Sequence, residues 1–118
     1  MTNYRIGINA EDMAVKLLRT KGYKIVAARV GAKRGTGAGE IDIVVVKGNT
    51  LVFVEVKKRT TISLALESII ARQQARVYRA AQVFLAKYPK YDRFDCRCAA
   101  IVFDDAGKSE HLENAWGM

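Results

Sequence analysis

The sequence predicts an α/β (α+β) fold in which a central mixed β-sheet of about five strands is flanked by helices. Three observations predict it. An amphipathic helical stripe near the N-terminus precedes two runs rich in Val, Ile and Phe, at residues 41–46 and 51–56. A long helical pattern over residues 64–88 then leads into residues 93–103, which are apolar on both faces, as buried strands are.

Length and composition limit the type of protein. The 118 residues are expected to form a single domain over residues 1–118, which buries about two-thirds of its unfolded surface. No apolar run approaches the length of a membrane span, and the start of the chain lacks the apolar segment of a secretory signal. We therefore expect a cytoplasmic protein without a membrane partner. Cys96 and Cys98 are interpreted as reduced packing residues of a strand.

The charge balance indicates a polyanionic partner. The net charge is +8 and the isoelectric point is about 9.7. Charge alone does not distinguish nucleic acid, anionic lipid and an acidic protein. Lipid fits least well, because the chain has no basic amphipathic helix with exposed aromatic anchors. Nucleic acid is the favoured partner.

The first helix is expected to begin after Asn9, whose side chain can cap it, and to end before Gly22. Glu11 lies in its first turn, at the flank of the apolar stripe. Taken alone, Glu11 is interpreted as an acid that complements the positive end of the helix dipole. A strand over residues 23–29 follows.

Residues 30–39 are predicted to form a flexible basic loop, because they hold four glycines together with Lys33 and Arg34. The glycine spacing matches neither a P-loop nor a dinucleotide-binding fingerprint. The loop could lie along a phosphate backbone, or it could serve only as a connection.

The two apolar runs that follow are predicted to form a β-hairpin around a Gly48-Asn49 turn. With a two-residue turn, Asp42 lies opposite Glu55 and Glu40 lies opposite Lys57. Side chains alternate faces along a strand and opposed residues share a face, so these groups project from the same side of the sheet.

This arrangement of charges favours a functional site. Two facing carboxylates, Asp42 and Glu55, raise each other's pKa unless a cation lies between them. A divalent metal is the natural candidate, with Lys57 beside it to meet an anion. The alternative is a surface ladder of salt bridges, but the almost wholly apolar strands around the charges favour the site.

The long helical pattern over residues 64–88 has two unusual features. Gln73 is the only polar residue in its apolar stripe, so its amide either bonds local backbone or points into a polar site. Basic residues with expected nucleic-acid contacts lie on another face of this helix and just before it: Lys58, Arg59, Arg72, Arg76 and Arg79. Such a ridge can be merely solvated, but no acid lies between Ala71 and Asp92, and this imbalance favours phosphate contacts.

Pro89 is expected to stop this helix. Residues 93–103 are predicted to form a central strand, and residues 108–113 a short edge strand after a turn.

Two pieces of sequence resemble a known superfamily. Gly39-Glu40-Ile41-Asp42 followed by Phe53-Val54-Glu55-Val56-Lys57 resembles the PD-(D/E)xK nucleases, which have the restriction-endonuclease-like fold. With Gly22-Tyr23, Arg93-Phe94-Asp95 and Asn114-Ala115-Trp116, nearly the whole chain resembles the YraN-like proteins. This bacterial family is predicted to consist of endonucleases and is similar to archaeal Holliday junction resolvases.

The resemblance implies roles for individual residues. Asp42 and Glu55 would bind Mg²⁺ or Mn²⁺, with the Val56 carbonyl as a backbone ligand. Lys57 would orient the attacking water and stabilise charge on the phosphate. Glu11 would reach the site from the first helix, and Gln73 matches a polar helix position near the site in relatives. The proline of the motif name is absent, and Arg72 stands where relatives often have lysine.

Three hypotheses follow. The first is a Mg²⁺-dependent endonuclease acting on DNA, including branched or structured DNA, and the resolvase resemblance adds an expected homodimer. The second is a non-catalytic nucleic-acid-binding module that retains the nuclease fold. The third is a structural or interaction protein whose charges form only salt bridges. It predicts no salt-dependent DNA binding, whereas the first two predict an affinity for DNA that falls steeply with salt.

Overall fold

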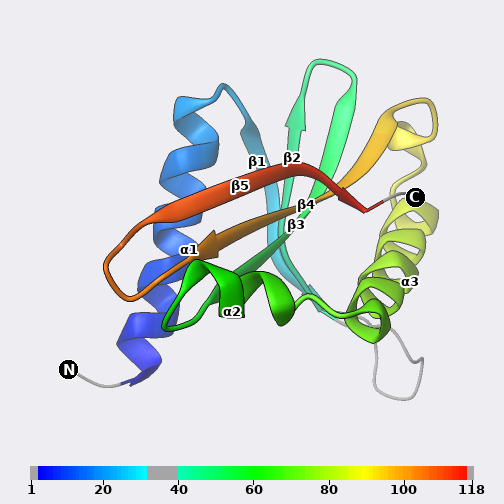
Figure 1. The fold of residues 1–118 in the computed structure, drawn as a ribbon. Helices are drawn as coiled ribbons and strands as arrows, with labels where there is room; N and C mark the ends of the chain where they lie inside the picture. The colour runs from blue at the N-terminus through cyan, green and yellow to red at the C-terminus, as the bar shows by residue number, and fades with distance from the viewer. Residues whose placement is uncertain (1–2, 32–39, 117–118) are drawn as a thin grey trace.

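The computed structural model describes residues 3–31 and 40–116, so Lys33 and Arg34 of the predicted basic loop lie outside the described residues. Figure 1 shows an α+β fold in which helices flank a five-stranded mixed sheet. This confirms the predicted class and is consistent with a restriction-endonuclease-like fold. The elements in chain order are α1 (Asn3–Thr20), β1 (Lys24–Gly31), β2 (Glu40–Lys47), β3 (Thr50–Lys58), α2 (Ile62–Glu67), α3 (Ala71–Lys87), a 3₁₀ turn η1 (Pro89–Tyr91), β4 (Asp95–Phe103) and β5 (Ser109–Trp116).

The strands lie in the order β1-β2-β3-β4-β5, and only β3 and β4 are parallel. A parallel neighbour requires the chain to cross over, and α2 and α3 form that crossover. The β2–β3 register runs from the pair Ile43–Val54 to the pair Lys47–Thr50. This confirms the predicted two-residue turn, in which Gly48 adopts a φ of 58°.

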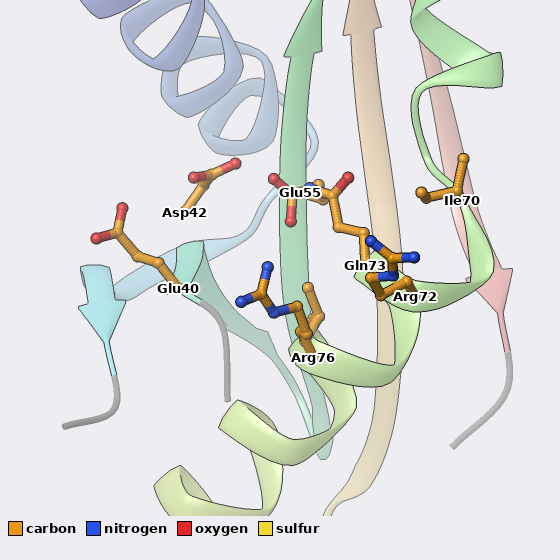
Figure 2. Close-up of a pocket in the computed structure, with 8 residues that line it drawn as sticks. Glu40, Asp42, Glu55, Ile70, Arg72, Gln73 and Arg76 are labelled. Carbon is orange, nitrogen blue, oxygen red and sulfur yellow. The ribbon is translucent and has the colours of Figure 1, made fainter. Parts of the chain in front are cut away.

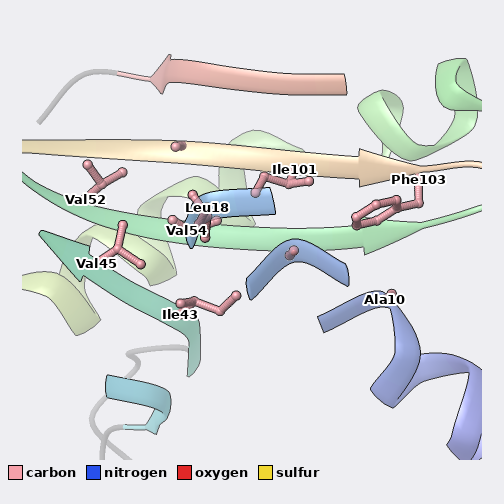
Figure 3. Close-up of a cluster of buried hydrophobic side chains, with 10 residues drawn as sticks. Ala10, Leu18, Ile43, Val45, Val52, Val54, Ile101 and Phe103 are labelled. Atoms are coloured by element: carbon pink, nitrogen blue, oxygen red, sulfur yellow. The ribbon is translucent and has the colours of Figure 1, made fainter. Parts of the chain in front are cut away.

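The sheet separates two hydrophobic clusters. On one face, α1 packs against strands β2, β3 and β4, and Figure 3 shows Leu18 among Val54 and Ile101. On the other face, α3 packs Val77 and Phe84 onto the sheet. Strands β3 and β4 are therefore buried on both faces, as their continuous apolar runs predict.

The first helix is longer than the sequence suggests. It begins at Asn3, so the prediction that Asn9 caps it is wrong. Helix propensity differs little among ordinary residues, and a residue suited to capping can lie inside a helix that tertiary packing stabilises. The predicted end is confirmed: Gly22 has a φ of 91°, and the amide of Tyr23 donates to the Leu18 carbonyl at 3.0 Å.

The predicted helix over residues 64–88 is wrong, because the structure divides it into α2 and α3. The Ser68 hydroxyl donates to the Ala65 carbonyl at 2.6 Å, and Ile70 is extended, with φ −84° and ψ 163°. A Ser side chain competes for backbone groups, and β-branched residues are costly in helices, so residues 68–70 favour a break. Within residues 3–31 and 40–116, no helix is long and apolar enough to cross a membrane.

The C-terminal strands complete the sheet. β4 is central and largely buried, as predicted. β5 is the predicted edge strand but extends to Trp116, beyond the predicted end at Glu113, because it continues to pair with β4 as far as the pair Cys98–Trp116.

Candidate active site

Asp42 lies where strands β2 and β3 separate. The ladder between them ends at the pair Ile43–Val54, one pair short of the predicted Asp42–Glu55 pair. Beyond this pair, the Val56 amide donates to the side chain of Asp42 rather than to a backbone carbonyl, with 2.7 Å between the Val56 nitrogen and Asp42 Oδ2. This hydrogen bond fixes the carboxylate at the end of the hairpin.

The same geometry orients the Val56 carbonyl. The N–H and C=O of one strand residue point to the same side of the strand, and the Val56 N–H points toward β2. The Val56 carbonyl therefore also points toward β2, beyond the last described ladder pair. An oxygen ligand at this position is next to Asp42.

Glu55 is the buried charge of the site. Within the described part of the chain it is the one buried charged residue, with 4% of its surface exposed. It alternates with Val54 and Val56, which pack on the α1 side, so its side chain points toward α3. Burial, a hydrogen bond to Asp42 and the charge of Asp42 together raise the pKa of Glu55 from 4.5 to about 8, against the opposing charge of Lys57.

Lys57 and Gln73 form a second contact next to Glu55. Lys57 Nζ lies 3.8 Å from Glu55 Oε1. The Gln73 amide satisfies both its ends when its oxygen accepts from Lys57 Nζ at 2.7 Å and its nitrogen donates to the Ser68 carbonyl at 3.0 Å. A hydrogen bond from Gln73 to Glu55 would lower the pKa of that carboxyl, but this orientation directs the amide N–H to Ser68 instead.

Asp42, Glu55 and Gln73 line a pocket of about 390 Å³. Figure 2 shows Glu40 at one end and Ile70 at the other, with Gln73 directed toward Glu55 between them. The pocket combines acids from the two hairpin strands with bases from α3, and its lining residues are Glu40, Asp42, Glu55, Ile70, Arg72, Gln73, Arg76 and Val77. An anion near the arginines would therefore lie next to the carboxylates.

Glu11 is held outside this lining. Its Oε2 accepts from Arg29, at 2.9 Å from one terminal nitrogen and 3.1 Å from Nε. Arg29 lies between the pairs Ala28–Ile43 and Val30–Ile41, which places it opposite Asp42 on β1. Glu11 is thus one strand away from Asp42, and its role in catalysis stays a prediction.

Among the described residues, the other basic side chains with expected nucleic-acid contacts do not line this pocket. Lys58 ends β3, and Arg59 donates to its carbonyl at 2.7 Å. Arg79 lies one to two turns along α3 from Arg72 and Arg76. Their contacts with nucleic acid stay predictions.

The sequence did not indicate three residues that the structure places at the site: Ser68, Arg29 and Ile70. The contact of the Ser68 carbonyl with Gln73 was not predicted, because it depends on a helix break that the sequence did not indicate. Arg29 has no sequence signal, because its position depends on the β1–β2 register. Ile70 could have been noticed as an apolar residue at the start of a basic helix.

The donor set of the site suits a hard cation. Asp42, Glu55 and the Val56 carbonyl offer only oxygen, and Mg²⁺ is commonly held by one or two carboxylates while it keeps several waters. The described residues contain no group of three or more His, Cys, Asp or Glu side chains that could hold a metal. The fit therefore depends on the two carboxylates. Burial and the nearby Asp42 raise the pKa of Glu55, and a bound cation would offset the repulsion between the two groups.

The sheet, the crossover helices and the Asp42, Glu55 and Lys57 arrangement define an α+β protein consistent with the restriction-endonuclease-like fold. Residues 10–99 match the uncharacterised protein family UPF0102. The chain belongs to this family, the YraN-like proteins.

Curated relatives cover most of the chain. A UPF0102 protein of Parvibaculum lavamentivorans is 43% identical over 113 residues, which is 96% of this chain and 82% of that protein. A UPF0102 protein of Paramagnetospirillum magneticum is 39% identical over 95% of this chain and 87% of its own length. A UPF0102 protein of Methylorubrum extorquens is 40% identical over 93% of this chain and 83% of its own length.

Proposed function

We propose that this protein is a Mg²⁺- or Mn²⁺-dependent endonuclease that hydrolyses phosphodiester bonds in DNA. One observation supports this most strongly. The buried Glu55 shares a hydrogen bond with Asp42 and faces Lys57, in a pocket whose other wall carries Arg72 and Arg76. Folding gains little from a buried carboxylate with a raised pKa, so such groups are candidates for function.

The residues would divide the chemistry as follows. Asp42, Glu55 and the Val56 carbonyl would hold the cation, which when bound supplies Lewis acidity and lowers the pKa of water. Lys57, held by the Gln73 amide, would orient the attacking water and stabilise charge that develops on the phosphate. Arg72 and Arg76 would position the substrate phosphates.

A cleavage assay tests the proposal. Labelled duplex, single-stranded and four-way-junction DNA are incubated with Mg²⁺ or Mn²⁺, with EDTA as the reference. We expect cleavage that requires metal and disappears in Asp42→Asn. Asp92→Asn, the same change at an exposed aspartate outside the pocket, should keep full activity.

A non-catalytic nucleic-acid-binding module is the second candidate. It is favoured because the described residues contain no group of three or more His, Cys, Asp or Glu side chains that could hold a metal ion. It predicts that DNA binds with a strong salt dependence, that nothing is cut, and that Asp42→Asn binds as well as the wild type. That combination of results would refute the nuclease.

A further inference from the structure

Ile70 occupies a position where the fold favours a different residue. It is the N-cap of α3, it has no side chain that can accept a backbone hydrogen bond, and 53% of its surface is exposed. Ser, Thr, Asp and Asn are preferred at N-caps. The preceding helix follows this rule, because the Thr61 hydroxyl accepts from the Leu64 amide at 3.1 Å. Such a local departure from sequence rules is expected mainly at functional sites.

The surroundings of Ile70 indicate what an exposed apolar residue could do at this N-cap. Ile70 lines the pocket of the carboxylates and lies at the opposite end from Glu40 (Figure 2). The other apolar lining residue, Val77, is buried in the core beneath α3. Ile70 is therefore the exposed apolar surface of a pocket that is otherwise charged or polar.

A nucleotide combines the two chemistries that this pocket offers. Its phosphate suits Arg72 and Arg76, and the flat face of its base suits an apolar side chain. In a continuous duplex, stacking covers the base faces and leaves only the edges accessible in the grooves. An isoleucine can reach a base face only after the base has left the stack.

The size of the pocket agrees with a single nucleotide. Its volume of about 390 Å³ is near the lower end of small-molecule sites. A volume of this size has no room for a stretch of duplex. Because Glu55 is buried, only a group that enters the pocket can reach its carboxylate.

We propose that Ile70 is a specificity-determining residue that packs against the face of an unstacked base beside the reactive phosphate. The substrate class is then DNA with an unpaired nucleotide, such as a bulge, a flap or a branch point, in preference to continuous duplex. Unstacking a paired base costs free energy, whereas an unpaired base is already available. This inference rests on the proposed function for its reaction, and its base contact can be tested by binding alone.

The experiment uses two DNA duplexes that differ in one feature. One carries 2-aminopurine in a single-nucleotide bulge, and the other carries it paired with thymine. Affinity and 2-aminopurine fluorescence are measured in EDTA for the wild type, Ile70→Ser and Leu64→Ser. Leu64 is the matched control, because it is an apolar residue with 49% exposure that does not line the pocket.

We expect the wild type to bind the bulged duplex about tenfold more tightly, in line with the worth of one base contact. Its 2-aminopurine fluorescence should change on binding, as the environment of the unstacked base changes. Ile70→Ser should bring the affinity ratio to within about twofold of one without weakening binding to paired duplex, and Leu64→Ser should keep the wild-type ratio. Ile70→Ser should melt no lower than the wild type, because serine is favoured at an N-cap.

Equal affinity of the wild type for the two duplexes would overturn the inference, as would an unchanged ratio in Ile70→Ser or an equal loss in Leu64→Ser. Cleavage with Mn²⁺ on the same duplexes separates the two proposals. Metal-dependent cleavage without a preference for the bulge would leave the nuclease standing and refute the role of Ile70. A preference that depends on Ile70, without cleavage, would refute the nuclease and retain the base contact.

Discussion

Replacing Glu55 with glutamine should change how the stability of the metal-free protein depends on pH. Burial, the hydrogen bond to Asp42 and the charge of Asp42 together raise the pKa of Glu55 from 4.5 to about 8. A glutamine at this position has nearly the same shape, cannot ionise and can still donate to the Asp42 carboxylate. Glu55→Gln therefore removes the titration while it preserves most of the packing.

The sign follows from proton binding. Between pH 4.5 and about 8 the folded protein keeps the Glu55 proton and the unfolded chain releases it, so the free energy of unfolding falls as the pH rises. The contribution is complete below pH 4.5 and lost above about pH 8. Each pH unit is worth about 1.4 kcal/mol, so the change across this window has an upper bound of roughly 5 kcal/mol. Structural relaxation around a buried charge reduces it to a few kcal/mol.

Urea unfolding followed by circular dichroism, in EDTA at pH 5, 6, 7 and 8, measures this effect. We expect wild type and Glu55→Gln to be similar at pH 5, and the variant to be more stable by a few kcal/mol at pH 8. Glu67→Gln, the same change at an exposed glutamate on α2, should follow the wild type. Parallel pH profiles for wild type and Glu55→Gln would refute the reasoning, because they would show that Glu55 keeps an ordinary pKa in the folded protein.

Mg²⁺ extends the same test to the metal. At one fixed concentration, equal to 100 times its dissociation constant at pH 8, the ion should add about 2.7 kcal/mol to the stability of the wild type at that pH. The gain should be larger at pH 8 than at pH 6, because binding competes with the Glu55 proton. Glu55→Gln should gain much less, and an equal gain in both proteins would place the ion elsewhere.

Two further variants test the surroundings of the site. Arg29 has a φ of 53°, a backbone conformation that favours glycine. Urea unfolding should therefore show Arg29→Gly to be more stable than Arg29→Ala by about 1 kcal/mol. An alanine variant of equal or higher stability would contradict backbone strain at this position. Arg76→Gln should lower the slope of log affinity for duplex DNA against log salt by about 0.9, measured by fluorescence anisotropy in EDTA. Arg93→Gln, at an exposed arginine outside the pocket, should keep the wild-type slope, and an equal change in both variants would argue against a specific phosphate contact by Arg76.

Local sequence patterns determined much of the fold. The Val- and Ile-rich runs around Gly48-Asn49 predicted the hairpin and its register, because turn length fixes which residues face each other. The apolar stripe of the first helix and the glycine after it predicted where that helix packs and ends. These signals are short-range, so they can be interpreted without knowledge of the rest of the chain.

Parts of the site could also be anticipated from the hairpin register and the family resemblance. Asp42 and Glu55 were expected to lie together, and the structure brings them into hydrogen-bond contact. Gln73 was marked by its polarity within an apolar stripe, and it contacts Lys57. What these residues do in a reaction stays a prediction.

The tertiary structure alone decided how these groups are arranged. The hairpin ladder ends before Asp42, and its carboxylate takes the Val56 amide; no local pattern specifies where two strands separate. The helix break at residues 68–70 presents the Ser68 carbonyl to Gln73. The pairing of Glu11 with Arg29 joins α1 to β1 across 18 positions of sequence. Sequence periodicity describes neighbours along the chain, whereas the burial of Glu55 and the contacts around it arise only when distant segments pack against the same end of the sheet.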